Sequence, residues 1–348
     1  MIKEPRDFGN RYRRDYLNGL KRLISAQQTA SQSARDAISA QILSHPEEMR
    51  ARYKEMLGWP LTLPKSKELP KVQSTFVGKE DEISVYRLQI DVLGVPFYGI
   101  LFVNEDGTPR PLVISQHGGL GTPELCSSMF AEGSSNYNEM TVRALAYDVN
   151  VFAPQLLLWR GEFDVLPEDE EKKAEDASPD PVRRTLDNEL KQLGGSITAF
   201  EIYCIQRSLD YLQEQPYVDK DRMGMAGLSY GGFYTLYTTA AEPRLKSSLS
   251  CCSYNDRLEY NWFDWTWKDA AHTFTDNEIA LLVYPRALIL SVGTRDELFE
   301  VEKARQEYAK LERFLPKDHR ITLETFDGTH EFTTVETTVE RFIRDLKE

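Results

Sequence analysis

A glycine-flanked serine lies past the middle of the chain, in the run Gly-Leu-Ser-Tyr-Gly at residues 227–231. The residues before it predict a buried strand over 223–228, and those after it predict a helix over 232–241. On such a tight turn the positions two before and two after the serine must be small, because neighbouring backbone approaches them closely. The serine hydroxyl then projects from the sheet. We therefore predict Ser229 as the nucleophile of an acyl-transfer reaction, the alternative being a structural serine in a turn.

A serine hydroxyl is a weak nucleophile at neutral pH and needs a base that a third group holds in place. Of five histidines, His330 follows the last predicted strand and precedes the last predicted helix, where a loop over the sheet edge can reach Ser229. We predict His330 as the general base, against the alternative of a surface-loop histidine. The other four are His45, His117, His272 and His319. For His117, in the loop after an early strand, we favour a structural role in supporting that loop.

The acid of such a triad is expected after an earlier strand than the base. Asp296 stands just past a predicted buried strand at 287–292, where Gly293 turns the chain. Its carboxylate would accept the hydrogen bond of the imidazole and stabilise the imidazolium ion. We predict Asp296 as the acid. Asp256, which follows another predicted strand, is the alternative, and for either carboxylate the competing interpretation is a solvated loop charge.

Acyl transfer also needs hydrogen-bond donors for the oxyanion of the tetrahedral intermediate. The backbone N–H of Tyr230, directly after the nucleophile, is one predicted donor. A second is expected from the loop that follows the strand 111–115, which reads His-Gly-Gly-Leu-Gly. Its glycines allow main-chain amides to point inward, so Gly118 or Gly119 is the predicted second donor.

These residues need a scaffold that brings distant segments to one edge. Patterns typical of strands and helices alternate through most of the chain. Predicted strands lie at 83–92, 95–103, 111–115, 149–154, 223–228, 245–252, 287–292 and 321–326, and predicted helices at 137–147, 197–212, 232–241, 299–314 and 335–346. Alternating units imply an α/β fold with a mostly parallel central sheet, covered by helices on both faces, and ligands at the carboxyl ends of its strands.

The N-terminal part has a different pattern. Residues 1–70 are predicted as a helical extension, with two or three helices between residues 10 and 57 and a proline-bounded linker over 60–70. Residues 71–348 are predicted as the catalytic domain. For the N-terminal helices three roles stay open: covering the active-site mouth, forming a homodimer surface, or simply stabilising the domain.

Two insertions interrupt the alternation, at about 160–183 and 254–280, and we expect them to form a lid or cap. The first is rich in charged residues and proline, and the second is rich in aromatic residues. Aromatic rings can line an acyl or sugar pocket, so we predict Trp159, Trp262 and Trp265 as substrate-binding residues. The equally favoured alternative for the second insertion is that its tryptophans anchor a cap to the body.

Composition excludes several classes of function. The 348 residues carry a formal net charge of −13, and an acidic surface repels phosphate backbones and anionic lipid. No run approaches the roughly 20 apolar residues of a membrane span, and the first residues lack an apolar signal core. We therefore expect a cytoplasmic protein with no nucleic-acid or membrane partner. The four cysteines lack the spacing of a metal site, and no cofactor motif is present, so no metal and no cofactor are expected.

The chain order nucleophile, acid, base, together with an upstream His-Gly-Gly loop, resembles that of the α/β-hydrolase superfamily. The resemblance covers residues 72–348 and is closest to the branch of dienelactone hydrolases and acetyl xylan esterases. The residues that carry it are the two-strand lead-in to that loop, the stretches 218–222 and 284–288, and the pair His330-Glu331. Where deacetylases of this branch have Arg-Gly-x-Gln, this chain has Arg-Gly-Glu-Phe at 160–163.

The resemblance implies a serine esterase that cleaves a small-molecule carboxylic ester through an acyl-enzyme, with a small acyl or acetyl ester of a carbohydrate as one candidate substrate. The segment 227–232 is also similar to the nucleophile region of prolyl-oligopeptidase-type peptidases. Those usually carry an N-terminal propeller, which about 70 mostly helical residues cannot build. A peptidase or amidase is therefore the alternative, and a non-catalytic binding protein with the same fold is a third.

Overall fold

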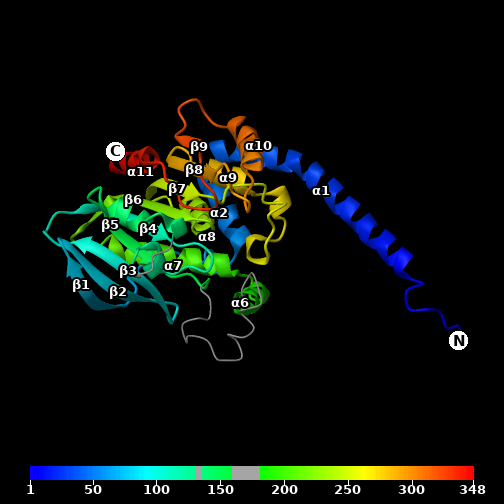
Figure 1. Ribbon diagram of the computed structural model, residues 1–348, viewed down its shortest axis with the longest axis horizontal. Coiled ribbons are helices and arrows are strands. Elements are labelled where there is room, and N and C mark those ends of the chain that lie inside the picture. The colour runs from blue at the N-terminus through cyan, green and yellow to red at the C-terminus, as the bar shows by residue number, and fades with distance from the viewer. Residues whose placement is uncertain (130–134, 159–180) are drawn as a thin grey trace.

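The computed structural model describes residues 1–129, 135–158 and 181–348 (Figure 1). Within them one nine-stranded sheet has the order β1-β2-β3-β5-β4-β6-β7-β8-β9. The strands are β1 (Val72–Glu80), β2 (Ile83–Val92), β3 (Val95–Asn104), β4 (Arg110–Gln116), β5 (Asn150–Pro154), β6 (Val218–Leu228), β7 (Leu245–Cys251), β8 (Ala287–Gly293) and β9 (Ile321–Phe326).

The sheet divides into two parts. β1, β2 and β3 pair antiparallel with each other, and β3 pairs antiparallel with β5. From β5 to β9 every neighbouring pair is parallel. The carboxyl ends of β6, β7, β8 and β9 therefore lie side by side at one edge, which is where the predicted catalytic residues follow their strands.

Helices cover both faces of this sheet (Figure 1). They are α1 (Asn10–Ser44), α2 (Pro46–Leu57), α3 (Pro123–Cys126), α4 (Met140–Leu145), α6 (Pro181–Gln192), α7 (Ile197–Leu212), α8 (Tyr230–Ala241), α9 (Asp276–Leu281), α10 (Val301–Glu312) and α11 (Glu336–Lys347), with single turns η1 (Ser135–Tyr137), η2 (Phe263–Trp265) and η3 (Ala270–His272).

The buried apolar side chains form two clusters, one on each face of the sheet. Alternate residues of a strand point to opposite sides, and Leu288 and Leu290 belong to one cluster whereas Ile289 belongs to the other. The first cluster includes side chains of α2, α7, α8, α9 and α10, and the second includes those of α4 and α11. The predicted α/β architecture, a mostly parallel sheet with helices on both faces, is confirmed.

The N-terminal residues form two helices, in agreement with the predicted two or three. Met49, Tyr53 and Leu57 of α2 are almost completely buried and belong to the same cluster as the sheet. α1 behaves differently: its buried residues begin only at Ser31, and its first half projects away from the body (Figure 1).

The strand β1 and the helices α3, α6 and α9 were not predicted from the sequence. β1 pairs with β2 at the edge of the sheet, but most of its residues are exposed, so it lacks the apolar alternation that marks a half-buried strand. The helix α9 is only six residues long and lies at the end of the aromatic insertion, which was predicted as a cap.

Candidate active site

The strand β6 turns directly into α8 at Ser229, which has φ 59° and ψ −120°. A non-glycine residue rarely adopts positive φ, and it persists only where its surroundings hold it. The two flanking glycines provide the space. A Cβ added to Gly227 would lie 2.4 Å from the carbonyl oxygen of Gly231, and one added to Gly231 would lie 2.1 Å from that of Gln116. The steric reason given for the glycine spacing therefore agrees with the geometry of this turn.

The loops after β8 and β9 bring Asp296 and His330 into contact. His330 Nδ1 lies 2.9 Å from Asp296 Oδ2. The other carboxylate oxygen, Oδ1, accepts hydrogen bonds from the backbone N–H groups of Leu298 at 2.8 Å and Phe299 at 3.0 Å. Both oxygens of this fully buried carboxylate are thus occupied.

The surroundings keep Asp296 ionised. Burial by itself raises the pKa of the carboxyl, but the hydrogen bond and charge of His330 and the two backbone amides outweigh burial, so the pKa lies below its usual value. A carboxylate that stays charged accepts the Nδ1–H proton of the imidazole. The Nε2 atom of His330 is then the nitrogen left to receive a proton.

Close backbone contacts fix these loops relative to the nucleophile turn. The backbone N–H of Ser229 donates to the carbonyl oxygen of Cys251 at 2.9 Å. The neighbouring Cys252 thiol lies 3.3 Å from the carbonyl oxygen of Glu331, beside His330. A Cβ added to Gly293 would lie 2.3 Å from the carbonyl oxygen of Thr329. The ends of β6, β7, β8 and β9 are therefore packed together, although among the described residues the Ser229 hydroxyl has no hydrogen-bond partner.

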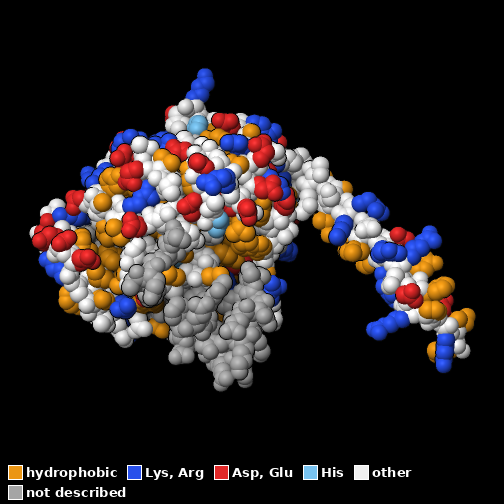
Figure 2. All heavy atoms as spheres, in the orientation of Figure 1, with side chains coloured by type: hydrophobic (Ala, Val, Ile, Leu, Met, Phe, Trp, Pro, Cys, Tyr) orange, Lys and Arg blue, Asp and Glu red, His pale blue; other side chains and the backbone are white. Residues whose placement is uncertain are grey.

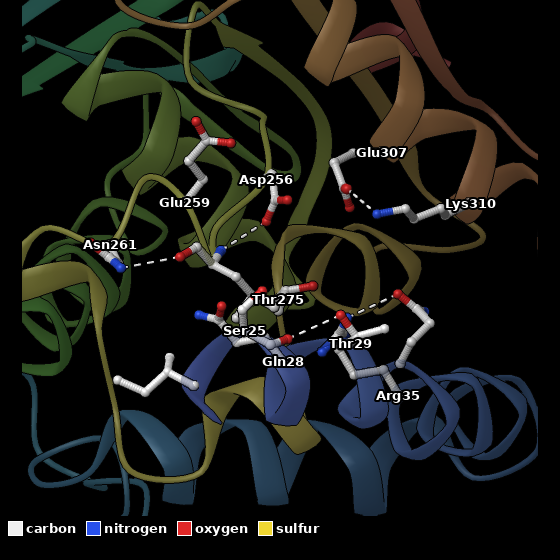
Figure 3. A pocket seen from close by; sticks show the side chains of 13 residues that line it. Ser25, Gln28, Thr29, Arg35, Asp256, Glu259, Asn261, Thr275, Glu307 and Lys310 are labelled. Carbon is white, nitrogen blue, oxygen red and sulfur yellow. Dashed lines mark hydrogen bonds and ion pairs between the residues drawn. The ribbon is translucent and has the colours of Figure 1, made fainter. Parts of the chain in front are cut away.

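Asp256, the alternative acid, lies in a different environment. Its Oδ1 accepts a hydrogen bond from the backbone N–H of Leu258 at 2.9 Å. It lines a cavity between α1 and α10 together with Glu259 and Glu307 (Figure 3). Its carboxylate thus faces α1, and the contact with His330 belongs to Asp296.

The two glycines predicted as oxyanion donors are in different states. The backbone N–H of Gly118 donates to the hydroxyl of Tyr137 at 2.9 Å, so it is already engaged. The N–H of Gly119 has no partner among the described residues, and a Cβ on Gly119 would lie 3.2 Å from the Tyr230 ring. Tyr230 is the first residue of α8, where a backbone N–H has no acceptor within the helix. Of the predicted pair Gly118 and Gly119, the hydrogen bonding leaves Gly119 available.

His117 is completely buried at the start of this loop. Its Nε2 accepts the backbone N–H of Leu156 at 2.9 Å, so Nδ1 carries the proton and donates to the carbonyl oxygen of Gly118 at 2.8 Å. Burial lowers the pKa of His117 to about 4, and the ring is neutral at pH 7. These contacts agree with the structural role favoured for His117, because its neutral ring joins the glycine loop to the segment after β5.

The aromatic insertion packs against α8. Trp265 is 1% exposed, and its ring stacks against those of Phe233, at a centroid distance of 4.6 Å, and Trp262, at 4.3 Å. Trp265 therefore anchors the insertion to α8, in agreement with the alternative that its tryptophans anchor a cap, and its contact with a substrate stays a prediction. Trp262 is only partly buried. Its ring lies 6.0 Å from that of Phe299, which in turn lies 5.6 Å from the His330 ring. Trp159, the third predicted substrate-binding residue, and most of the first insertion lie outside the described residues.

A buried ionic network next to the nucleophile was missed by the sequence analysis. Arg183, at the start of α6, donates two hydrogen bonds of 2.9 Å to Glu201 of α7 and one of 2.8 Å to Asp264. Asp264 also accepts a hydrogen bond from the Tyr230 hydroxyl at 3.1 Å. The network therefore orients the side chain of a predicted oxyanion residue. The available signal was Glu201, a charged residue inside the apolar helix predicted over 197–212.

One trio of metal-ligand types lies at the triad. Suitable atoms of Cys252, Asp296 and His330 all fall within 4.8 Å of one another. However, the His330 and Asp296 atoms already form the hydrogen bond of the predicted triad, and the hydrogen bond with Cys251, together with burial, raises the pKa of the Cys252 thiol well above its usual value. The trio therefore fits a triad with an inert neighbouring thiol better than a metal centre.

A family model and a curated relative match parts of this chain. The model of the prolyl oligopeptidase family matches residues 205–341, the segment from α7 to α11 that contains all three predicted triad residues. A curated relative from Bacillus subtilis (strain 168), named "Putative hydrolase YtaP", is 32% identical over 109 residues, which are 29% of this chain and 36% of that protein. The chain thus matches only about a third of the length of that relative.

Solved structures match over most of the chain. A putative acetyl xylan esterase from Bacteroides fragilis has a TM-score of 0.63 at 11% identity, over 86% of this chain and 81% of that one. A glucuronoyl esterase from Solibacter usitatus has a TM-score of 0.59 at 14% identity, over 88% and 92%. Acetyl xylan esterase 1 from a Thermoanaerobacterium species has a TM-score of 0.53 at 16% identity, over 87% of this chain and 94% of that one. At these identities the likeness shows a shared fold. No helix among the described residues is long and apolar enough to span a bilayer.

Proposed function

We propose that this chain, which belongs to the α/β-hydrolase superfamily, is a serine hydrolase that cleaves a carboxylic ester through an acyl-enzyme. Ser229 is the nucleophile, His330 the general base and Asp296 the acid that orients His330. The backbone N–H groups of Tyr230 and Gly119 form the oxyanion hole. The observation that carries the proposal is the 2.9 Å contact between His330 and a buried, ionised Asp296, at the sheet edge where Ser229 occupies a strained turn.

The chemistry follows from these positions. Ser229 Oγ attacks the acyl carbon while its proton passes to His330 Nε2, and the carbonyl oxygen becomes an oxyanion that the two backbone amides stabilise. The imidazolium ion, held by Asp296, then protonates the leaving alcohol oxygen as the ester bond breaks. In the second half of the reaction a water molecule loses its proton to His330 and attacks the acyl-enzyme, which releases the acid and restores the Ser229 hydroxyl.

The substrate class we favour is a small acyl ester, such as an acetyl ester of a carbohydrate. Acetyl xylan esterases and a glucuronoyl esterase share the fold over more than four fifths of the chain. The partly exposed Trp262, close to Phe299 beside His330, offers an aromatic surface on which a sugar ring can pack. We also place the enzyme in the cytoplasm, since its four cysteines are free and buried, which suits a reducing compartment.

A peptidase or amidase is the second candidate. The prolyl oligopeptidase family model matches the whole segment from 205 to 341, and the same triad can attack an amide. Residues 1–71 contain two helices and no strand, and the solved structures that share the fold over more than four fifths of the chain are esterases. An ester therefore remains the favoured substrate.

The deciding experiment compares the wild type with Ser229→Ala, using Ser33→Ala on the exposed face of α1 as a control. Each protein is incubated with a fluorophosphonate probe, p-nitrophenyl acetate and longer esters, acetylated xylo-oligosaccharides, and dipeptide p-nitroanilides. We expect labelling and ester turnover in the wild type and the control, and a loss of turnover of at least about a thousandfold in Ser229→Ala.

Three other outcomes would redirect the proposal. Faster cleavage of anilides than of esters would favour the peptidase. A Ser229→Ala variant that is labelled and active like the wild type would place the nucleophile elsewhere. A folded wild type that is neither labelled nor active would favour a non-catalytic binding protein.

A further inference from the structure

The helix α1 has one apolar stripe that is buried along half of its length only. Leu17, Ile24, Ser31 and Ile38 recur every seven residues, so they share one helix face. Ser31 and Ile38 are 2% and 6% exposed, whereas Leu17 and Ile24 are 50% and 48% exposed. The face that α1 uses to pack on its own body therefore continues, uncovered, along its projecting half.

The uncovered part is large. Residues 10–30 come before the first buried residue of α1 and extend about 30 Å at 1.5 Å per residue. The exposed large apolar side chains at this end of the chain, residues 1–30, are Met1, Ile2, Phe8, Tyr12, Tyr16, Leu17, Leu20, Leu23 and Ile24. Figure 2 shows apolar and basic side chains crowded along this arm. A contiguous exposed apolar face of this extent marks an interaction surface.

Charge indicates what covers it. Residues 1–30 hold seven Lys or Arg and three Asp or Glu, whereas the remaining 318 residues hold 35 basic and 52 acidic side chains. The arm is therefore basic and the body strongly acidic. A second copy of the chain offers the arm an acidic surface. A polyanion such as an anionic bilayer would also attract the arm, but it would repel the acidic body to which the arm is attached.

A groove of about 710 Å³ lies where the arm leaves the body. In Figure 3, Gln28 and Arg35 of α1 lie on one side of it, and Asp256, Glu259 and Glu307 on the other. Because α1 itself forms one wall, a helix placed in the groove would pack along α1. Two copies related by a twofold axis can therefore place each arm in the other's groove, an arrangement that is self-complementary.

We propose that α1 is a dimerisation arm: the basic, apolar first half of α1 from one copy docks in the groove between α1 and α10 of a second copy, whose wall opposite α1 carries the carboxylates of Asp256, Glu259 and Glu307 and the ammonium group of Lys310. The two arms then run antiparallel, and the stripe of Leu17 and Ile24 is covered by the partner. The proposal concerns the assembly and does not depend on the reaction at Ser229.

The test is the molar mass in solution, measured by sedimentation and light scattering from 1 to 50 µM chain. We expect twice the 40.0 kDa of one chain for the wild type, and a single chain for the double variant Leu20→Asp with Ile24→Asp. Leu93→Asp, which changes an equally exposed leucine in the turn between β2 and β3, should remain dimeric. Thermal unfolding checks that the variants keep the fold.

The charge part of the proposal has its own variant. Glu259→Lys, in the wall of the groove, should weaken the dimer at least tenfold in 50 mM salt, with a smaller effect in 500 mM salt because salt screens the interaction. A wild type that is a single chain at 50 µM in both salts overturns the proposal, as does a dimer that survives the double variant. A single chain that binds vesicles with 30% anionic lipid, and loses that binding in the double variant, would instead assign the arm to a membrane surface.

Discussion

The helices α8 and α1 are held in opposite ways. All twelve residues of α8 are buried, and Gly232 lies so close to β7 that an added Cβ would be 2.4 Å from the carbonyl oxygen of Cys251. Only five of the 35 residues of α1 are buried. The packing around α8 can hold Ser229 at a positive φ, since many contacts oppose its relaxation. The first half of α1 has no such constraint, and its position depends on what binds it.

The change with the largest expected effect acts on the orientation of His330. Asp296→Asn keeps the size of the side chain but removes the charge, so we expect kcat to fall by about 10⁴ with the fold intact. Asp256→Asn is the matched control, because this carboxylate faces the groove beside α1, and its kcat should change less than tenfold. Steady-state ester kinetics measure both. The opposite pattern would make Asp256 the triad acid.

The next largest effect should come from crowding the nucleophile turn. In Gly231→Ala the new methyl group would meet the carbonyl oxygen of Gln116 at 2.1 Å, so we expect a loss of about 3 kcal/mol or more in unfolding free energy. Gly78→Ala on the exposed edge strand β1, where nothing lies within 4 Å, is the control and should change stability by less than about 1 kcal/mol. Urea titrations measure both, and equal losses would show that the turn is not specially constrained.

Lowering the pH should reduce the free energy of unfolding through His117, which is buried at the active-site loop. Its folded-state pKa is about 4, below the value of about 6.5 for an unfolded histidine. Between pH 6.5 and 4 the unfolded chain takes up a proton that the folded chain does not, so stability is lost as pH falls, by about 3 kcal/mol. In His117→Gln this part of the loss should be absent. Urea unfolding of both proteins at several pH values measures it, and parallel profiles would contradict the buried, neutral histidine.

The pH dependence of stability should have the opposite sign for Glu278, which lies where α1 meets the body. Burial, only partly offset by hydrogen bonds from Thr275 and the charge of Arg35, raises the pKa of Glu278 to about 7. As pH rises from about 4.5 to 7 the unfolded chain loses a proton that the folded chain keeps, so stability falls over this window. Arg35, whose Nε is 4.0 Å away, can approach the carboxylate as it ionises, so we expect a loss of about 2 kcal/mol.

The variant Glu278→Gln tests this effect. It should gain stability relative to the wild type as pH rises from 4.5 to 7.5, as measured by urea unfolding. A stability difference that does not change with pH would show that folding does not raise the pKa of Glu278.

Local sequence patterns predicted those elements whose own residues show a clear apolar periodicity. The predicted bounds of β2, α7 and β9 are those of the structure, because each element has a clear apolar period and a clear end. β1 has no such signal, since it is an exposed edge strand held by main-chain hydrogen bonds to β2. The buried partners of Tyr230 were equally hidden, because Arg183, Glu201 and Asp264 come from three separate segments.

The sequence by itself determined the α/β class and which residue types follow the strands β6, β8 and β9, because periodicity and glycine spacing are local properties. Only the tertiary structure decided that Asp296 and not Asp256 contacts His330, that the amide of Gly118 is engaged while that of Gly119 is not, and that Trp265 is covered. Each of these depends on which loops meet at the edge of the sheet, and that is fixed by packing between segments far apart in the chain. The same holds for α1: its heptad stripe is visible in the sequence, but where the body stops covering the stripe is a property of the folded molecule.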